Sequence, residues 1–395
     1  MIKRKNEIPD LLNKNQSLLV LGPRGAGKTF FINNYLKEKA SSFQVDLLNN
    51  DLRKKYLHDP GQIRKEIDYL FEKRKKLHVF IDEIQKVPEL LDEIHAMIEK
   101  YQQNCIFILT GSSARKIKKT HTNMLAGRAL FVHFYPFTSQ EIDFNIHLEK
   151  ILQFGTLPKA FLEEDTGIIS RYLSTYTDTY LRQEILDEAL SRRIDEFSRF
   201  LELAAFENGK PVNYSKLAKQ INISDKTVSS HFQILEDSLI ATRIPAWTFS
   251  ARKQLQKSAK YFFFDNGLLN SLTGELHTEL RPGSYRYGRL FENLIVNEII
   301  RINNMHNYNY KLYHYRTNHG EEIDLILQKT IKTNPVAVEI KSAAIPAAHE
   351  VKALSAFKTE FPQSRCYVLC RTDTAYKDNG ITFLPFAGGV KEIFQ

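Results

Sequence analysis

Short apolar runs of strand length recur along the first 140 residues of the chain. The runs at residues 18–21, 77–81 and 105–109 are predominantly apolar, as expected of strands that are buried on both faces of a sheet. A helix is expected to begin at about Gly27, directly after the first run. This pattern predicts an α/β domain over residues 1–140, with ligands bound at the carboxyl ends of its strands.

Residues 141–194 follow the period of amphipathic helices and are interrupted once, at the sequence FGTLPKA. No motif with a chemical role stands out between the two ends of this segment. We therefore expect a helical lid or connector that leads from the α/β domain to the rest of the chain.

Residues 195–260 contain two short helical patterns on either side of a turn at residues 222–224. Ser224 or Asp225 can cap the second helix. Apolar residues follow i, i+4 and i+7 spacing in that helix and are expected to pack inward: Val228, Phe232 and Leu235. A strand-like alternation follows at residues 239–247. Helix, turn, helix and strand in this order resemble a winged helix.

The polar side of the second helix and the loop that follows the strand predict contact with DNA. The helix residues expected to point outward are Lys226, Thr227, Ser230, His231 and Gln233. The loop has no acidic residue and carries four cations, Arg252, Lys253, Lys257 and Lys260. A basic loop beside a polar helix is suited to phosphate contacts combined with groove reading. The alternative is that this module packs against protein, as winged helices often do in multidomain proteins.

Residues 261–395 read as a second α/β domain, in which a helix precedes several strands. The helical sequence YGRLFENLIVNEII has Glu292 near its start, and the strand-like sequence EEIDLILQ contains Asp324. Glu339 and Lys341 stand two residues apart in the next strand, so their side chains are expected to share one face. An E-x-K triplet alone carries little information. Its position in the chain, after a helix carboxylate and a strand aspartate, makes it informative.

A glycine-rich turn between the first strand and its helix has the pattern G-x-x-x-x-G-K-[ST] of a phosphate-binding loop. Its glycines let backbone amides close around phosphate, and the helix N-terminus adds a favourable dipole. Lys28 is expected to reach the β- and γ-phosphates of ATP, and Thr29 to place a hydroxyl on Mg²⁺. The residues predicted to bind the nucleotide are Gly22, Pro23, Arg24, Gly25, Ala26, Gly27, Lys28 and Thr29.

Two acidic residues follow the second apolar run, at the edge of the sheet where the nucleotide is expected. Asp82 is predicted to hold Mg²⁺ through water, and Glu83 to orient or deprotonate the attacking water. The competing interpretation is an acidic helix N-terminus after a core strand, but the upstream glycine-rich loop favours a catalytic pair.

These features resemble the AAA-type ATPases, in which a polar residue at the end of the next strand senses the γ-phosphate. That resemblance assigns the sensing role to Thr110. The phrase NMLAGRALFVHFYPFTSQEI is similar to one in a large prokaryotic group of AAA ATPases, and Arg128 within it is our candidate for the cation that neutralises transition-state charge. Arg115 is the rival candidate.

The C-terminal series of helix carboxylate, strand aspartate and E-x-K resembles the restriction-endonuclease-like fold. The resemblance implies a Mg²⁺ site at Asp324 and Glu339, with Glu292 as the helix carboxylate and Lys341 positioning the hydrolytic water. Converging carboxylates repel one another without a cation, so a metal is physically reasonable. The alternative is an inherited scaffold in which Lys341 and the carboxylates form an ion-pair network.

Bulk properties narrow the picture further. A net charge of +9 suits a polyanionic partner without requiring one. The three cysteines lie in or beside strand-like runs without the spacing of a zinc site, so we expect buried thiols. No apolar stretch approaches the roughly 20 residues of a membrane span, and no signal peptide is evident, so a cytoplasmic protein is expected.

Taken over nearly its full length, the chain resembles a prokaryotic family of AAA ATPases whose C-terminal region combines a winged helix with a nuclease-like domain. YFFFDNGLLNSLTG and YRTNHGEEIDLIL are typical phrases. The resemblance implies four parts, at residues 1–140, 141–194, 195–260 and 261–395. It implies a Mg²⁺-dependent ATPase that acts on DNA, and either self-association or a partner protein. The alternative is a nucleotide-gated switch with non-catalytic C-terminal modules.

Overall fold

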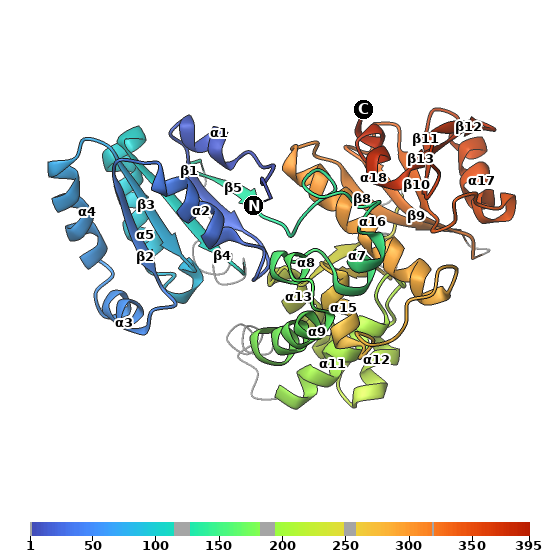
Figure 1. The fold of residues 1–395 in the computed structure, drawn as a ribbon, viewed down its shortest axis with the longest axis horizontal. Helices are drawn as coiled ribbons and strands as arrows, with labels where there is room; N and C mark the ends of the chain where they lie inside the picture. The colour runs from blue at the N-terminus through green and yellow to red at the C-terminus, as the bar shows by residue number, and fades with distance from the viewer. Residues whose placement is uncertain (1, 114–126, 182–193, 249–257, 318–319) are drawn as a thin grey trace. The chain divides into compact units, whose positions relative to one another are not determined.

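The computed structural model describes residues 2–113, 127–181, 194–248, 258–317 and 320–395. The chain divides into two compact units, which are described separately. One unit contains residues 3–136 and 237–239, and the other contains residues 137–236 and 240–395. Figure 1 shows the elements of both units.

The unit of residues 3–136 is built on a five-stranded parallel sheet with the order β2-β3-β4-β1-β5. The strands are β1 (Ser17–Leu21), β2 (Ser42–Asp46), β3 (Leu77–Asp82), β4 (Cys105–Gly111) and β5 (Ala129–His133). Every residue of β1, β3 and β4 is buried. The continuous apolar runs therefore predicted the central strands correctly, because a strand covered on both faces needs no polar side.

Helices cover both faces of this sheet (Figure 1). They are α1 (Ile8–Asn13), α2 (Lys28–Lys37), α3 (Asn50–His58), α4 (Gln62–Lys73) and α5 (Leu90–Tyr101). Successive strand residues point to opposite faces, so Leu19 and Leu18 enter two separate cores. Leu19 packs with residues of α3, α4 and α5, and Leu18 packs with residues of α1 and α2.

The second unit begins with a helical segment that contains α7 (Leu148–Phe154), α8 (Pro158–Leu162), α9 (Thr166–Thr175) and a π-helical turn (Tyr176–Leu181). The predicted interruption lies between α7 and α8, where Gly155 has a φ of +76°. The Asp265 carboxylate accepts a 2.7 Å hydrogen bond from the backbone amide of Thr156 there, and it also caps α15 (Asn266–Leu272). The glycine is required because a Cβ would lie 1.9 Å from an oxygen of Asp265.

The described residues between 194 and 263 form the two predicted helices, the turn and the strand, together with an additional helix, α11, and an additional strand, β7. The elements are α11 (Ile194–Phe206), α12 (Tyr214–Ile221), α13 (Asp225–Asp237), β6 (Ala241–Ile244) and β7 (Lys260–Phe263). Ser224 accepts a hydrogen bond from the Thr227 amide at 3.1 Å and thereby caps α13. Val228, Phe232 and Leu235 are buried, as predicted. Because β7 pairs antiparallel with β6, the hairpin crosses the domain boundary predicted at residue 260.

The remaining residues form the long helix α16 (Tyr285–Met305) and a six-stranded mixed sheet with the order β12-β13-β11-β10-β9-β8. The strands are β8 (Lys311–Arg316), β9 (Glu322–Gln328), β10 (Val336–Ile340), β11 (Arg365–Cys370), β12 (Tyr376–Asp378) and β13 (Ile381–Pro385). Two further helices are α17 (Lys352–Glu360) and α18 (Phe386–Gly389). The mixed sheet agrees with the predicted second α/β domain.

One hydrophobic core of the second unit joins its helical segment, the elements α11 to β7 and the mixed sheet, and a separate cluster packs on the sheet with α17. Members of that first core include Leu152 of α7, Phe232 of α13, Phe291 of α16 and Val338 of β10. The parts predicted at residues 141–194, 195–260 and 261–395 are thus packed together. This shared core brings residues of β7 next to residues of α16 and of the C-terminal sheet.

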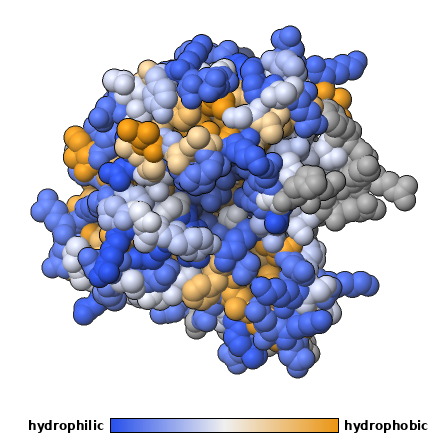
Figure 2. All heavy atoms as spheres, turned by 90° about the vertical axis from the view of Figure 1, so that its right-hand side faces the viewer, coloured by the Kyte–Doolittle hydropathy of each residue, from blue (hydrophilic) through white to orange (hydrophobic). Residues whose placement is uncertain are grey.

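The three cysteines, Cys105, Cys366 and Cys370, are buried free thiols, as predicted. Among the described residues, the search for a helix of sufficient length and hydropathy to cross a bilayer found none. On the face shown in Figure 2, hydrophilic residues cover most of the surface and hydrophobic residues form small separate groups.

Candidate functional site

The glycine-rich loop connects the end of β1 to α2 and is shaped by its glycines. Gly25 and Gly27 have φ values of +77° and +96°, which residues with a Cβ adopt only with strain. Gly22 is needed for a different reason, because a Cβ there would lie 1.9 Å from the carbonyl oxygen of Phe134. The loop therefore takes a shape in which backbone amides can surround a phosphate.

Lys28 is the first residue of α2, and its side chain lies within the loop. The ammonium group donates hydrogen bonds to the carbonyl oxygens of Gly22 at 2.7 Å and Pro23 at 3.2 Å. These contacts hold the charge at the position predicted for the phosphates. The Arg4 guanidinium supports the same loop from outside, by donating to the Ala26 carbonyl at 3.0 Å and lying over the Phe134 ring.

Three predicted residues from three different elements meet at the end of the sheet. The Thr29 hydroxyl donates to one oxygen of Asp82 at 2.7 Å, and the Thr110 hydroxyl donates to the other. Thr110 also accepts a hydrogen bond from the Glu83 amide at 3.2 Å. The Thr29 hydroxyl and the Asp82 carboxylate supply hard oxygen ligands that fit Mg²⁺, with phosphate and water completing its shell.

Burial is the largest influence on the pKa of Asp82 and raises it above its usual range. The hydrogen bonds from Thr110 and Thr29 act in the opposite direction, the nearby Glu83 raises the pKa further, and Lys28 lowers it. A cation beside this carboxylate would oppose the effect of burial, because it stabilises the charged form.

Glu83 is held by two residues for which no catalytic role was predicted, Gln85 and Ser112. One oxygen of its carboxylate accepts hydrogen bonds from the side-chain amide of Gln85 and from the Ser112 hydroxyl, the latter at 3.0 Å. Gln85 also donates to Ser112 at 2.9 Å, and all three residues are buried. Glu83 has a left-handed φ of +58°, which turns the chain so that Gln85 faces it. No sequence signal marks that turn.

Arg128 does not lie beside the nucleotide loop of its own chain, so its assignment as the cation that neutralises transition-state charge stays a prediction. It directly precedes β5, whose first residue Ala129 is paired with Ser17 at the amino end of the parallel strand β1. The loop follows the carboxyl end of β1, so the two are separated by the length of the sheet. The guanidinium instead forms an ion pair with Glu99 of α5. Arg115 lies outside the described residues.

A cavity of about 990 Å³ lies in the second unit and brings together three of the four predicted C-terminal residues. Glu292 of α16, Asp324 of β9 and Lys341 all line it. Glu339 does not line the cavity. Its side chain is buried, and one of its oxygens accepts a 2.7 Å hydrogen bond from the Lys341 ammonium. The ion pair confirms that Glu339 and Lys341 share one face.

Lys260 also lines this cavity, and its predicted place on an exposed DNA-binding loop was wrong. It is the first residue of β7, with a side chain only 3% exposed. Its ammonium lies 3.4 Å from an oxygen of Glu322 and 3.8 Å from an oxygen of Glu292. Lys260 is the last lysine of the basic loop sequence and the first residue of β7. Periodicity did not indicate that a strand begins there, so the sequence did not predict that Lys260 is buried.

Two carboxylates of this cluster, those of Glu292 and Glu339, are harder to ionise than free side chains. Burial is the main cause and raises the pKa of Glu292 to about 7 and that of Glu339 to about 8, and the Asp324 charge adds to both shifts. Lys260 and Lys341 oppose the shift of Glu292, and Lys341 opposes that of Glu339. The described residues contain no group of three or more His, Cys, Asp and Glu side chains arranged to hold a metal ion.

The outer face of α13 carries part of the predicted DNA contact. Lys226 and Ser230 are exposed and Thr227 is half-buried. His231 is buried, so its predicted outward orientation was wrong. Its ring lies 4.7 Å from that of Phe197 and 5.0 Å from that of Phe200, both on α11, because α11 covers that side of α13. Arg252, Lys253 and Lys257 lie outside the described residues.

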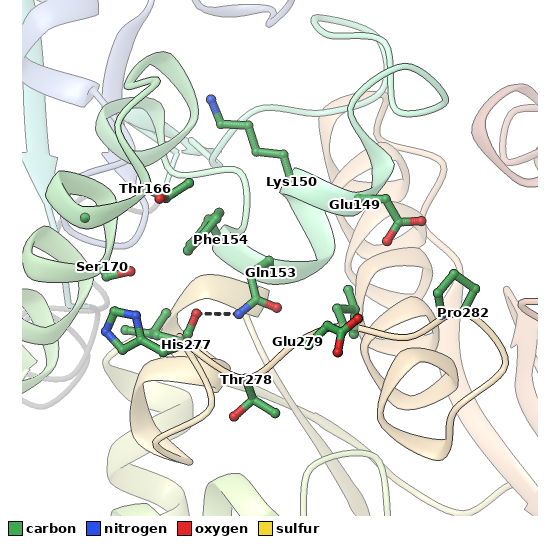
Figure 3. Close-up of a pocket in the computed structure, with 13 residues that line it drawn as sticks. Glu149, Lys150, Gln153, Phe154, Thr166, Ser170, His277, Thr278, Glu279 and Pro282 are labelled. Carbon is green, nitrogen blue, oxygen red and sulfur yellow. Dashed lines mark hydrogen bonds between the residues drawn. The ribbon is translucent and has the colours of Figure 1, made fainter.

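A second cavity of about 780 Å³ lies between α7, α9 and the segment 276–282, as Figure 3 shows. Its polar groups are engaged in structural contacts. Gln153 donates to the Leu276 carbonyl, Lys150 donates to the carbonyls of Phe161 and Glu163, and Glu149 accepts from a tyrosine.

Three segments of the chain match models of known domain families. Residues 14–143 match the model of the AAA domain. Residues 145–279 match a domain of unknown function (DUF8612), and residues 287–387 match another (DUF4143). Residues 14–143 form an AAA domain. An AAA domain implies binding and hydrolysis of ATP, typically with Mg²⁺, and this agrees with the geometry of its loop and strand ends.

Three relatives match most of the chain at low sequence identity. Uncharacterized proteins from Mycobacterium tuberculosis and Mycobacterium bovis are each 22% identical over 85% of this chain and 72% of their own length. One from Haemophilus influenzae is 22% identical over 76% of this chain and 79% of its own. The structure of C. elegans PCH-2 matches 33% of this chain and 38% of that chain, with 20% identity and a TM-score of 0.24.

Proposed function

We propose that this protein is a Mg²⁺-dependent ATPase that hydrolyses ATP slowly and couples its nucleotide state to a DNA-binding winged helix. The observation that carries the ATPase part is the convergence of Thr29, Asp82 and Thr110, joined by hydrogen bonds at the carboxyl ends of β3 and β4. Each residue has the chemistry that phosphoryl transfer requires at that place.

Each group has a distinct role in this proposal. Lys28 exchanges its bonds with the loop carbonyls for bonds with the β- and γ-phosphates, which are stronger because both partners are charged. Glu83 orients the attacking water, while Gln85 and Ser112 fix the direction of its carboxylate. Thr110 senses the γ-phosphate through its contact with Asp82. Bound Mg²⁺ supplies charge neutralisation at the phosphates.

The test compares two substitutions in the full-length protein. Lys28→Ala should abolish ATP binding, because the cation that contacts the phosphates is removed. Glu83→Gln should retain ATP and lose turnover, because only the water-orienting charge is removed. ATP binding is measured by calorimetry and turnover by phosphate release. Unchanged turnover in both variants would contradict the proposal, and binding without turnover in the unmodified protein would favour a switch that barely hydrolyses ATP.

The DNA-binding part rests on the outer face of α13, which carries exposed Lys226 and Ser230 next to half-buried Thr227. These lie at and after the amino end of the second helix, where helix-turn-helix modules contact nucleic acid. The basic residues Arg252, Lys253 and Lys257 belong to the predicted wing between β6 and β7 and would extend the contact along the phosphates.

The proposed DNA contact predicts salt-dependent binding to duplexes of any sequence. Lys226→Glu should weaken DNA binding. The slope of the logarithm of the binding constant against the logarithm of the salt concentration should become shallower by about one unit for each lost phosphate contact. Lys352→Glu is a matched control, because this exposed lysine pairs with Glu321 near α17. Binding that ignores salt, or equal losses in both variants, would instead favour a protein-contact role for the winged helix.

Metal-dependent cleavage is not part of the function that we propose. The carboxylates predicted as metal ligands already face two buried or half-buried ammonium groups, those of Lys260 and Lys341. Incubation of the protein with DNA or RNA and Mg²⁺ or Mn²⁺, with and without ATP, tests this statement. Cleavage that disappears in both Asp324→Ala and Lys341→Ala would restore the nuclease interpretation.

A further inference from the structure

The sequence predicted a divalent metal ion in the 990 Å³ cavity lined by Glu292 and Asp324, but the residues present do not fit such an ion. Lys260 is the main reason. We infer that the Lys260 ammonium, which lies beside Glu292 and Glu322, takes the place of a metal ion among the carboxylates of this cavity, so that lysine holds the site together. The inference is independent of ATP hydrolysis, because every residue involved lies outside the AAA domain.

The charges around Lys260 are arranged to hold an ammonium group. Its oxygen neighbours belong to Glu322 at 3.4 Å and Glu292 at 3.8 Å, and it also interacts electrostatically with Asp324. A buried ammonium is costly unless it is paired, and these carboxylates supply the pairing.

The backbone of Lys260 is fixed, so its side chain has little freedom to withdraw. Lys260 pairs with Ile244 in the β6–β7 hairpin and forms a bridge with Pro211 on its other side. The preceding residue, Ala259, accepts a hydrogen bond from the Val212 amide at 2.9 Å. The side chain therefore starts from a fixed point, and because it is only 3% exposed, its neighbours enclose the ammonium among the carboxylates.

The remaining predicted ligands are also engaged. One oxygen of Asp324 accepts a 2.7 Å hydrogen bond from the Ile340 amide, and one oxygen of Glu339 accepts from Lys341. A divalent ion among these groups would stand close to two ammonium charges, which would repel it. Metal and lysine therefore exclude one another at this position.

The arrangement also assigns a structural role to the lysine. Lys260 belongs to the segment that matches DUF8612, whereas Glu292, Glu322 and Asp324 belong to the segment that matches DUF4143. The ion pairs thus join the winged-helix hairpin to α16 and to the mixed sheet. Removing the ammonium should open the site to a metal ion and loosen this junction.

The experiment measures Mn²⁺ binding to the full-length protein without nucleotide, by electron paramagnetic resonance and calorimetry. The unmodified protein should show no Mn²⁺ binding that depends on Asp324. Lys260→Met, which keeps most of the side-chain volume without the charge, should gain a Mn²⁺ site at least about 10-fold tighter than any in the unmodified protein. The gained site should disappear in the double variant Lys260→Met/Asp324→Asn.

Lys352→Met is the matched control, because it removes an ammonium from a surface ion pair with Glu321 and should leave Mn²⁺ binding unchanged. Two results would overturn the inference. One is Mn²⁺ binding by the unmodified protein that is lost in Asp324→Asn, which can be measured even if Lys260→Met does not fold. The other is a folded Lys260→Met protein, verified by circular dichroism, that gains no Mn²⁺ site.

Discussion

Thr29 donates a hydrogen bond to Asp82 at 2.7 Å, although a third strand lies between the strands that lead to these two residues. That intervening strand is β4, and its Thr110 binds the other oxygen of the same carboxylate. The carboxylate is therefore held from both sides before any nucleotide arrives. A group fixed in this way loses little conformational entropy when it binds a metal-bound water.

Replacing Thr110 by Val should lower turnover and leave ATP binding nearly unchanged. Valine keeps the shape and removes the hydroxyl that donates to Asp82 and accepts from the Glu83 amide. Hydrogen bonds to charged groups contribute about 1.5–3 kcal/mol, which corresponds to a loss in kcat of about 10- to 100-fold. Thr110→Ser restores the hydroxyl and should recover most of the rate. Equal rates in the valine and serine variants would contradict the assigned role.

Gln85→Leu should lower kcat about 10-fold, because the Glu83 carboxylate loses one of the two groups that orient it. The effect should depend on Glu83. In a Glu83→Gln background the same substitution should change turnover by less than about twofold, because there is no charged base left to orient. If the two substitutions lower turnover independently, Gln85 acts elsewhere.

Gly155→Ala should destabilise the second unit strongly. A left-handed backbone with a Cβ costs about 1–3 kcal/mol, and the collision with the Asp265 carboxylate, 1.9 Å away, adds a cost of similar size. Gly274→Ala is the matched control. That glycine has a φ of +71° and nothing within 4 Å of its added Cβ, so it reports backbone strain alone.

The measurement for these glycines is the urea midpoint of unfolding, followed by fluorescence of the single tryptophan, Trp247, which is buried in the second unit. The midpoint should fall clearly further for Gly155→Ala than for Gly274→Ala. Equal shifts would show that the space next to Asp265 is not limiting.

Arg128→Ala should leave kcat for ATP within about twofold of the unmodified protein, because the guanidinium lies at the amino end of the sheet and pairs with Glu99. Losing a mostly exposed ion pair should change the free energy of unfolding by at most about 1 kcal/mol. Glu99→Ala is the control that removes the same pair from the other side. A 100-fold loss of turnover confined to Arg128→Ala would indicate that this arginine acts on the nucleotide of a neighbouring molecule.

The amino-acid sequence by itself determined the nucleotide site. Gly22 to Thr29 are consecutive, and the glycines fix the loop shape locally, so spacing alone identifies the group of residues. Asp82, Glu83 and Thr110 were also predictable, because parallel strands deliver their carboxyl ends to one edge of a sheet. The inward face of α13 followed from helical periodicity, as buried Val228 confirms.

Only the tertiary structure decided which polar residues are covered by other elements. Periodicity places a residue relative to its own helix or strand and does not reveal what packs on the opposite side. His231 therefore reads as an outward residue but is covered by α11, and Lys260 reads as part of a basic loop but starts β7 among carboxylates. The position of Arg128 also depended on the tertiary structure, because the order and direction of the strands place it away from the glycine-rich loop of its own chain. The physical reason is that these contacts join segments distant in sequence, and their energy appears only when the chain is folded.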